Sequence, residues 1–487
     1  MKVSALILAI HMVEVTPCHF QKNIPREPVP SLDEWGELWK AWDMVTLSMI
    51  SKEMLHEKPI DLRNACIFYL GHIPTFLDIH LSQGLALEPT PPAYYRNIFE
   101  RGIDPDVISP EECHSHSEIP NEWPALDDLL AFQRRVRRRL QEAYARKDLA
   151  SNEKLRRRLW LGFEHEAMHL ETLLYMLVQS DQTRPPPGVK TPDWELLAES
   201  AAGDDGQGQW LDIAAKKVET GLEDDEGRET PGFYGWDIEC PKQVVEVKAF
   251  KARSRPITNG EYYEYTKKAG IRQLPATWVV LNGVPHVRTV FGPVALQYAL
   301  RWPAMASYEE LQAYAEWIGG RIPTSAELRS IYEGAYQKPV ERTTMISAVN
   351  GQLTESGVNE TPPQEIGEHN ESAQHTPYPN GKDLFYDVGA CNIGFKNWHP
   401  MPMKPNEVIG VGGSGAWEWT STELTAPSGY VQSTLYPAYS SDFFDSKHNI
   451  IGGGSWATIP RIAGRKSFVN WYQRKYPFAW ITARVVQ

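Results

Sequence analysis

A proline-free run at residues 155–178 constrains this fold more than any other stretch, because it predicts a long helix that carries two histidines. Its apolar residues recur at intervals of three and four, as in an amphipathic helix. His165 and His169 are four residues apart, so they project about 40° apart on one side of that helix. The pair could form half of a metal site, and the alternative is two structural histidines on an amphipathic helix.

Two further residues bear on a metal site at this pair. Glu171 lies about 120° from His165 around the helix, so we expect it to be structural or to support a ligand rather than to be one. His72 lies in a second apolar helical segment, at residues 62–81, just before Pro74. Pro74 should kink or restart that helix. A histidine at the kink could face a bundle interior, and the alternative is a core histidine bonded to backbone.

The length of 487 residues exceeds what one hydrophobic core can organise, so two or three domains are expected. Residues 1–30 are proline-rich and without periodicity, which is typical of a tail. Helical patterns then predict an antiparallel four-helix bundle over residues 31–180, and the interior of such a bundle is a usual place for metal ligands. The predicted helices lie at residues 35–50, 62–81, 127–145 and 155–178.

The second half of the chain has a different texture. Residues 181–232 are rich in Pro, Gly and acidic residues, so we expect an interdomain linker that is at most partly ordered. From residue 233 onward, short β-patterned segments alternate with glycines, and tryptophan becomes frequent. These features predict an irregular α+β domain over residues 233–487, with a surface insert at 340–380 and helices at 259–269 and 307–318. The fold class is therefore α plus α+β.

Charge and cysteine content exclude several classes of function. The formal net charge of −13 argues against a general nucleic-acid binder, and the Arg-rich stretch at 134–158 has the leucine spacing of a solvated helix face. The five cysteines are scattered and form no Cys-x2-Cys pair, which favours a reducing, cytoplasmic setting. No stretch reaches the roughly 18 apolar residues that cross a membrane, and the apolar run at 3–10 lacks a clear signal-peptide cleavage site.

Four motifs follow one another in the second half of the chain. They are Pro-Ile-Thr-Asn-Gly-Glu-Tyr at 256–262, Gly-Gly-Arg-Ile-Pro-Thr at 319–324, Trp-Glu-Trp-Thr-Ser at 417–421 and Gly-Gly-Ser-Trp at 453–456. In this order they resemble the signature of formylglycine-generating-enzyme-type domains. The resemblance implies the C-type-lectin-like fold of these sulfatase-modifying-factor domains. Formylglycine generation itself is disfavoured, because that chemistry relies on cysteines late in the domain and none follows Cys391.

The first half, with its His-x3-His-x-Glu string, resembles the DinB-like bundle fused to such domains in the sulfoxide synthases of ergothioneine biosynthesis. The resemblance spans about residues 31–487 and implies that His72, His165 and His169 hold a non-haem Fe(II), with positions left for O2 and a thiolate. The sequence is especially similar to the fungal type at residues 69–78, 392–400 and 464–472.

The family's reaction joins a cysteine-type sulfur to C2 of the imidazole of hercynine, the trimethylated betaine of histidine, and oxidises that sulfur to a sulfoxide. A tyrosine of the C-terminal domain assists. The resemblance implies Tyr439 for this role, although Tyr436 lies only three residues away. It also implies that Asn470 and Trp471, in the last motif, bind substrate.

Departures from the family pattern bear on the substrates. Bacterial relatives that use γ-glutamylcysteine have an acidic residue and an arginine after the Asn-Trp pair, whereas residues 472–476 here read Tyr-Gln-Arg-Lys-Tyr, which favours free cysteine. Fungal members usually also carry a methyltransferase that makes hercynine. This sequence starts almost at the bundle, so we expect a separate methyltransferase as supplier, unless the chain is a partial gene product or a diverged paralogue with another betaine or imidazole substrate. Residues 413–416 read Gly-Ser-Gly-Ala where the family more often has a Gly-Asn pair, which leaves room for altered activity.

Two alternatives to a hercynine-specific synthase stay open. One is a diverged paralogue that acts on another histidine-like acceptor, such as a 5-histidylcysteine sulfoxide synthase. The other is a non-catalytic, lectin-like binding protein in which the metal is purely structural.

Overall fold

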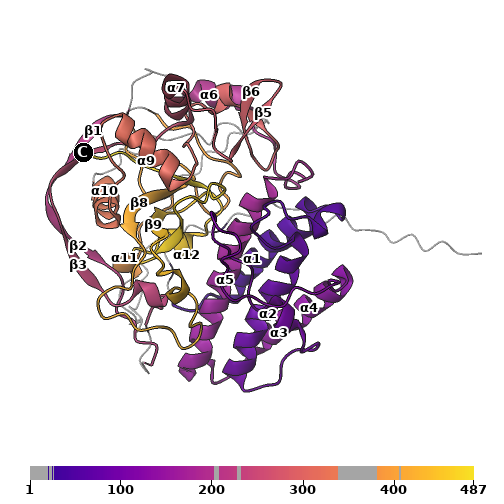
Figure 1. The fold of residues 1–487 in the computed structure, drawn as a ribbon. Helices are drawn as coiled ribbons and strands as arrows, with labels where there is room; N and C mark the ends of the chain where they lie inside the picture. Colours follow the sequence, from indigo (N-terminus) through magenta and orange to yellow (C-terminus); the bar gives the residue numbers. More distant parts are fainter. Residues whose placement is uncertain are drawn as a thin grey trace, which may run out of the picture.

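A computed structural model describes residues 20, 25, 27–201, 208–227, 232–337, 381–404 and 407–487. The expected insert at 340–380 and most of the expected tail at 1–30 lie outside these described residues. The described chain forms an N-terminal helical bundle followed by a C-terminal α+β domain, and the two lie side by side (Figure 1). This order confirms the predicted fold class.

Four helices of at least 13 residues form the bundle. The first begins with a capping box, in which the backbone N–H and the side chain of Ser31 exchange hydrogen bonds with Glu34. Short turns of helix connect the long helices. The elements are α1 (Leu32–Met44), η1 (Val45–Met49), η2 (Glu53–His56), α2 (Cys66–Leu85), α3 (Tyr95–Phe99), α4 (Leu126–Tyr144), η3 (Leu149–Ser151) and α5 (Glu153–Leu177).

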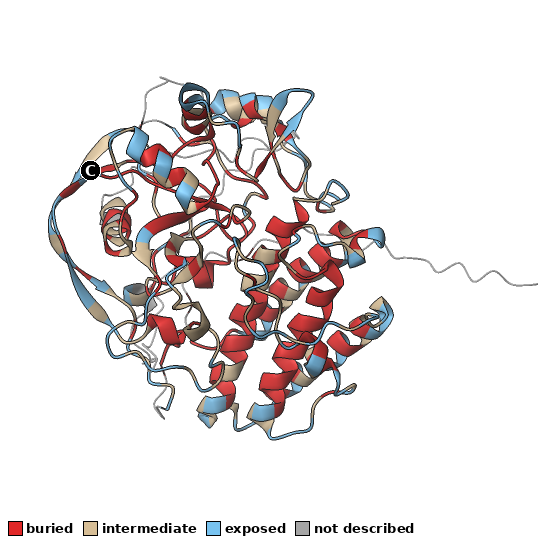
Figure 2. Cartoon of the chain, viewed as in Figure 1, coloured by how far each residue is buried: buried red, intermediate tan, exposed pale blue. Residues whose placement is uncertain are grey.

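Helix α2 lies at the centre of the bundle and packs against α4 and α5. Every residue from Cys66 to Ser82 is buried, as the red colour of this helix shows (Figure 2). The helix continues through Pro74 to Leu85, so the predicted restart does not occur. Packing on all sides of the helix compensates for the backbone donor that proline removes.

The central sheet of the C-terminal domain has the strand order β10-β9-β8-β11. Its two ends differ, because β11 runs parallel to β8 while β10 and β8 both run antiparallel to β9. Strand β8 is buried from Trp417 to Thr420, which places the Trp-Glu-Trp-Thr motif in the core. The strands are β8 (Trp417–Glu423), β9 (His448–Gly453), β10 (Asn470–Gln473) and β11 (Ile481–Thr482).

The segment at 181–232, expected to be a linker, contains ordered elements. Helix α6 (Trp194–Ser200) is followed by β1 (Trp210–Ile213) and β2 (Lys216–Thr220). Strand β1 pairs with β4 (Phe250–Arg253) and β2 with β3 (Gln243–Val247), both antiparallel. The paired residues lie 37–43 positions apart in the β1–β4 pair and 23–31 apart in the β2–β3 pair, so local sequence gives a weak signal for the pairing. These strands therefore extend the C-terminal domain.

The remaining elements of the C-terminal domain surround the central sheet. Helices α7 and α9 match the two predicted helices, whereas α10 was not predicted even though Thr324 and Glu327 form a capping box at its start. These elements are η4 (Asp237–Glu239), α7 (Asn259–Ala269), β5 (Trp278–Leu281), β6 (Val284–Val287), β7 (Val294–Ala295), α8 (Leu296–Ala299), α9 (Tyr308–Trp317), α10 (Ser325–Gln337), α11 (Gly381–Leu384), η5 (Ser441–Phe443) and α12 (Pro460–Ala463).

One continuous hydrophobic core runs through both domains, from Trp35 in α1 to Val485 near the end of the chain. Helix α5 lies beside the C-terminal domain (Figure 1), and its residues from Leu155 to Leu177 contribute to this core. Of the helices in the described part of the chain, none combines the length and the apolar character needed to cross a bilayer.

Candidate metal centre

Three histidines from two bundle helices meet at one point. Helix α5 carries His165 and His169 one turn apart, and α2 carries His72. One ring nitrogen from each histidine lies within 4.8 Å of the others. The structure therefore brings together all three predicted ligands, in an arrangement that lets three imidazoles bind one metal ion.

A hydrogen bond determines which ring nitrogen of His72 is free. Its Nδ1 lies 2.6 Å from the carbonyl oxygen of Phe99, and because a carbonyl only accepts, Nδ1 carries the proton. The unprotonated Nε2 then faces Nε2 of His169 at 3.2 Å. Gly71 permits this close approach of α3, since a Cβ there would lie 2.4 Å from the Phe99 ring. Such a backbone carbonyl is a common partner of metal-bound histidine.

Burial keeps the three imidazoles neutral. It lowers the pKa of His72 to about 4. It also lowers the pKa values of His165 and His169 well below the usual range, and the neighbouring histidines add to this effect. Neutral imidazole is the form that binds metal. Nδ1 of His169 is buried and has no hydrogen-bond partner among the described residues. A set of three neutral nitrogen donors suits Fe, Zn, Cu or Ni.

Phenylalanine rings enclose the histidines. Phe76 stacks on His165 with ring centroids 3.6 Å apart, and Phe68 stacks on His72 at 5.0 Å. Both rings lie four residues from His72 on α2, so one helix supplies a ligand together with its apolar surroundings. These rings provide the burial that keeps the imidazoles neutral.

The other predicted site residues lie on the C-terminal side of the domain interface. Tyr439 stacks on Trp236 with ring centroids 4.0 Å apart and meets Trp471 edge-on at 5.1 Å. Asn470 precedes Trp471 on β10, and its Oδ1 accepts a hydrogen bond from the Trp471 backbone at 2.8 Å. The structure therefore brings these three residues together, and Tyr439 is separated from His165 by Tyr436.

Tyr436 lies closer to the histidines than sequence reasoning indicated. Its ring centroid is 6.5 Å from that of His165 and 5.2 Å from that of Phe76, and it is 5.8 Å from Tyr439 on the other side. Burial raises the pKa of Tyr436 and raises that of Tyr439 further, so both phenols keep their protons. Both tyrosines lie in a loop, where no periodicity could rank one above the other.

Two carboxylates of α5 hold the C-terminal domain against the ligand-bearing helix. Glu164 and Glu171 are seven residues apart, so they share a helix face that differs from that of His165. Glu171 accepts hydrogen bonds from Trp417 Nε1 at 2.6 Å and from Thr458 Oγ1 at 2.7 Å. These contacts agree with the expectation that Glu171 supports the site rather than binding a metal.

Glu164 belongs to a buried cluster with Arg465 and Glu239. Arg465 Nη2 donates to Glu164 Oε2 at 2.8 Å and to Glu239 Oε1 at 2.8 Å, and its Nη1 donates to Glu164 Oε1. Trp160 and Trp236 donate their indole N–H groups to Glu164 at 2.7 Å and 2.9 Å. Every charged group of this cluster therefore has several partners, which is what buried charges require.

The tyrosines at residues 472 and 476 pack against the bundle at Tyr175 and Arg63. Tyr472 and Tyr476 stack at 5.5 Å, and Tyr476 Oη accepts a hydrogen bond from Arg63 Nε at 3.2 Å. Arg63 also pairs with Asp104 at 2.9 Å. Tyr69 lies nearby, with its ring centroid 6.0 Å from that of His169. This region is therefore lined by aromatic rings, and the positive charge beside them is the guanidinium of Arg63 from the bundle.

A cavity of about 520 Å³ lies between α5 and the C-terminal domain. Leu161, one turn before His165, lines it together with Trp236, Tyr436 and Tyr439. Because Tyr436 also contacts His165, one side chain separates the cavity from the three histidines. Its volume falls in the range of small-molecule sites.

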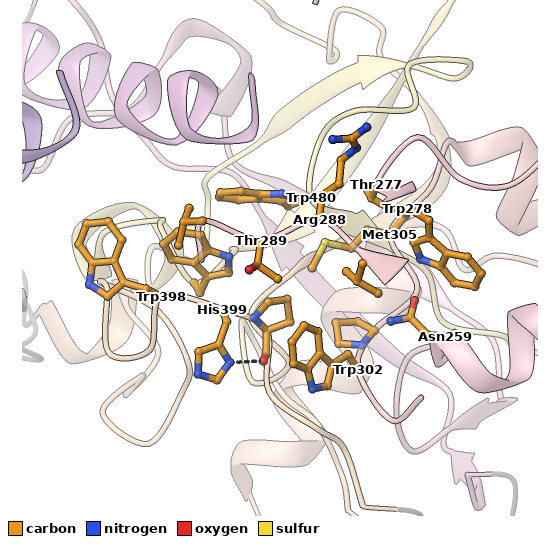
Figure 3. Close-up of a pocket in the computed structure, with 15 residues that line it drawn as sticks. Asn259, Thr277, Trp278, Arg288, Thr289, Trp302, Met305, Trp398, His399 and Trp480 are labelled. Atoms are coloured by element: carbon orange, nitrogen blue, oxygen red, sulfur yellow. Dashed lines mark hydrogen bonds between the residues drawn. The ribbon is translucent and has the colours of Figure 1, made fainter. Parts of the chain in front are cut away.

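A second hollow, inside the C-terminal domain, is much smaller. Its volume is about 20 Å³, and Trp302, Trp480 and His399 are among the residues that line it (Figure 3). The dashed line in the figure joins His399 to the carbonyl of Pro400. This volume has room for about one water molecule, which excludes an amino-acid substrate.

Two family models match the two halves of the chain. Residues 34–173 match the DinB superfamily. Residues 211–487 match the Sulfatase-modifying factor enzyme 1-like domain, a range that begins within β1 and so includes part of the segment expected to be a linker.

Three curated relatives align with the chain. Ergothioneine biosynthesis protein 1 of Neurospora crassa is 47% identical over 508 residues, covering 95% of this chain and 58% of that protein. The protein of the same name from Schizosaccharomyces pombe is 34% identical over 485 residues, covering 96% of this chain and 57% of that protein. Hercynine oxygenase of Mycobacterium tuberculosis is 29% identical over 259 residues, covering 48% of this chain and 52% of that protein. The chain thus spans little more than half the length of each relative.

The family match at residues 211–487 covers more than half of the chain, and the helical region ahead of it contains the three-histidine metal site. The chain therefore belongs to the sulfatase-modifying factor enzyme 1-like family, with a DinB-type bundle preceding the family domain.

Proposed function

We propose that this chain acts as an iron- and O2-dependent sulfoxide synthase that joins the sulfur of cysteine to imidazole C2 of hercynine, as in ergothioneine biosynthesis. The observation that carries this proposal is the three-histidine site, which lies buried where the bundle meets a tyrosine-bearing loop of the C-terminal domain. The names of the relatives, Ergothioneine biosynthesis protein 1 and Hercynine oxygenase, support the substrate class.

The proposed reaction balances with one molecule of O2. Cysteine loses its thiol hydrogen and hercynine loses the hydrogen at C2 as the C–S bond forms. One oxygen atom ends on the sulfur as the sulfoxide, and the other leaves as water with the two hydrogens. The reaction therefore needs no separate reductant.

His72, His165 and His169 would hold the Fe(II). Bound iron would supply the positions at which O2 and the thiolate meet and the electrons that activate O2. Phe99 would keep Nε2 of His72 directed at the metal through the hydrogen bond to Nδ1. The stacked ring of Phe76 would exclude water from the ligands.

A phenol of the C-terminal domain would hold and donate a proton near the reacting atoms. Family resemblance favours Tyr439 for this role, whereas the ring contact with His165 favours Tyr436. We assign the proton to Tyr436 Oη. Tyr439, stacked on Trp236, would then support Tyr436 from behind.

The substrates would bind on the C-terminal side of the site. Trp471, with Asn470 beside it, would offer a flat surface to the imidazole and a cation–π contact to the trimethylammonium group. Residues 472–476 correspond to the stretch in which γ-glutamylcysteine-using relatives have an acidic residue and an arginine, and here this stretch contains the stacked Tyr472 and Tyr476, which supports free cysteine as the sulfur donor. Hercynine would come from a reaction that methylates the amine of histidine.

The test is a reaction with deuterium-labelled acceptor. Anaerobic protein is loaded with Fe(II), mixed with cysteine and hercynine deuterated at C2, and exposed to O2. Mass spectrometry should show a sulfoxide that has lost the deuterium, and the His165→Ala variant should form none.

Two results would contradict the proposal. Iron-loaded protein that forms no sulfoxide from hercynine would exclude this reaction. A sulfoxide that retains the deuterium would exclude bonding at C2 and favour a different position on the imidazole.

A further inference from the structure

Residues 430–440, here called the tyrosine loop, carry Tyr436 and Tyr439 without any helix or strand of their own. Backbone hydrogen bonds of regular structure therefore do not fix their position. Two carboxylates from an earlier part of the domain, Glu226 and Asp237, reach the loop instead.

Asp237 holds the two ends of the tyrosine loop. Its Oδ2 accepts a hydrogen bond from Tyr430 Oη at 2.9 Å, and its Oδ1 accepts one from Ser440 Oγ at 2.8 Å. Asp237 also follows Trp236, on which Tyr439 stacks. The ends of the loop are thus attached to the segment that supports Tyr439.

Glu226 holds the middle of the loop directly before Tyr436. Its Oε2 accepts the backbone N–H of Thr434 at 2.8 Å, and its Oε1 accepts that of Leu435 at 3.1 Å. Ser433 Oγ lies 3.3 Å from the same Oε1, and that hydroxyl also accepts the backbone N–H of Tyr436 at 3.2 Å. The carboxylate thus contacts three consecutive residues through charge-assisted hydrogen bonds, and the Ser433 hydroxyl links it to the backbone of Tyr436. The backbone N–H of Ser433 itself donates to Asp237 Oδ2 at 3.3 Å.

We infer that Glu226 is a positioning residue, whose carboxylate fixes the backbone at residues 434–435 and the hydroxyl of Ser433 and so sets the place of Tyr436 beside His165. The loop also forms a wall of the 520 Å³ cavity, so the same carboxylate sets the distance between that cavity and the histidines. The consequence for catalysis rests on the proposed function, whereas the attachment of the loop does not.

The first experiment uses metal-free protein and requires no activity. In Glu226→Gln the amide NH2 replaces one acceptor and faces backbone donors, so the middle of the loop should detach. Chymotrypsin should then cleave after Leu435 or Tyr439 about tenfold faster than in the unchanged protein, because cleavage follows local opening. Asp225→Asn is the matched control, since it makes the same change of charge in the same cavity wall, and within the described part of the chain the Asp225 side chain accepts from Gly227 rather than from the tyrosine loop.

The second experiment separates positioning from general stability. Glu226→Gln should lower kcat by about 10- to 100-fold, as small misplacements of a reacting group do, while leaving iron affinity unchanged. In a Tyr436→Phe background the same substitution should have no further effect on kcat, because the group that it positions is already absent.

The outcomes distinguish this inference from the proposed function. Equal cleavage rates for Glu226→Gln and the unchanged protein would overturn the inference, whether or not a sulfoxide forms. Additive kinetic losses in the double variant would also overturn it and indicate a structural role alone. Faster cleavage in a protein that forms no sulfoxide would support the attachment of the loop and overturn the proposed function.

Discussion

Two buried polar clusters lie next to each other on helix α5 and are satisfied in opposite ways. Around Glu164, two carboxylates surround one guanidinium, and two indole N–H groups complete the contacts. Around His165, three neutral imidazoles face one another, and Nδ1 of His169 has no partner among the described residues. The first cluster is complete as it stands, whereas the second leaves electron pairs free for a cation.

The difference follows from how each cluster avoids the cost of burial. Charged groups inside a protein need partners of opposite charge, and Arg465 provides this for both Glu164 and Glu239. Histidines can instead lose their charge, as the lowered pKa values of His72, His165 and His169 indicate. Ion pairs therefore characterise the Glu164 cluster, which joins the two domains. Neutral imidazoles characterise the histidine cluster, which can bind a metal ion.

Breaking the paired cluster should have the largest effect. Arg465→Met would leave Glu164 and Glu239 buried without a cation, so we expect the free energy of unfolding to fall by about 3–5 kcal/mol. Arg101→Met is the control at the same domain interface, because the pair of Arg101 with Asp442 is partly exposed and should contribute less than about 1 kcal/mol. Urea unfolding measures both, and similar losses would remove the distinction between the clusters.

Removing one member of the neutral cluster should have the next largest effect, and on a different property. His169→Ala should weaken the binding of Co(II) or Fe(II) by more than about 100-fold, beyond what loss of a ligand's supporting partner costs. Metal-free His169→Ala should lose far less stability than Arg465→Met. Titration with Co(II), followed by absorbance, measures the affinity. A metal-free variant as unstable as Arg465→Met would show that the histidines serve as core residues.

His399 is a buried histidine outside the three-histidine site, so it shows what burial alone does to a histidine. It lies in the C-terminal domain, and burial lowers its pKa to about 4 although its Nδ1 donates to the Pro400 carbonyl at 2.7 Å. The unfolded protein therefore takes up this proton first, near pH 6.5, so the stability that neutral His399 provides is present above that pH. It is lost progressively as the pH falls from 6.5 towards 4.

Replacing His399 should reduce this acid sensitivity. Between pH 7 and pH 5, the free energy of unfolding should fall by about 2 kcal/mol less in His399→Gln than in the unchanged protein. Urea unfolding of metal-free protein at the two pH values measures the difference. Identical pH dependence would mean that burial does not hold His399 neutral.

Sequence patterns predicted the parts of the fold that depend on near neighbours. The spacing of apolar residues predicted α5, and the four-residue interval predicted that His165 and His169 share a side. His72 required the family resemblance, because α2 is buried all round and its sequence marks no special face. Strand β1 and helix α10 were missed, the first because its partner strand lies far along the chain.

The interface between the domains could not be predicted from the sequence. Glu164 and Arg465 are 301 residues apart, and no local pattern links them. Tyr436 and Tyr439 are equivalent in sequence, since both lie in a loop. Only the packing shows that Tyr436 contacts His165 while Tyr439 stacks on Trp236.

Helix α5 carries His165 and His169 and also the two carboxylates, Glu164 and Glu171, that bind the C-terminal domain. This arrangement limits which domains could be exchanged between relatives. A straight helix transmits position at about 1.5 Å per residue, so moving the docked domain by one residue would displace Tyr436 relative to His165. A chimera that takes its C-terminal domain from a relative should therefore place its tyrosine beside His165 only if that domain reproduces the partners of Glu164 and Glu171. The transferable unit is therefore the pair of domains with α5 between them.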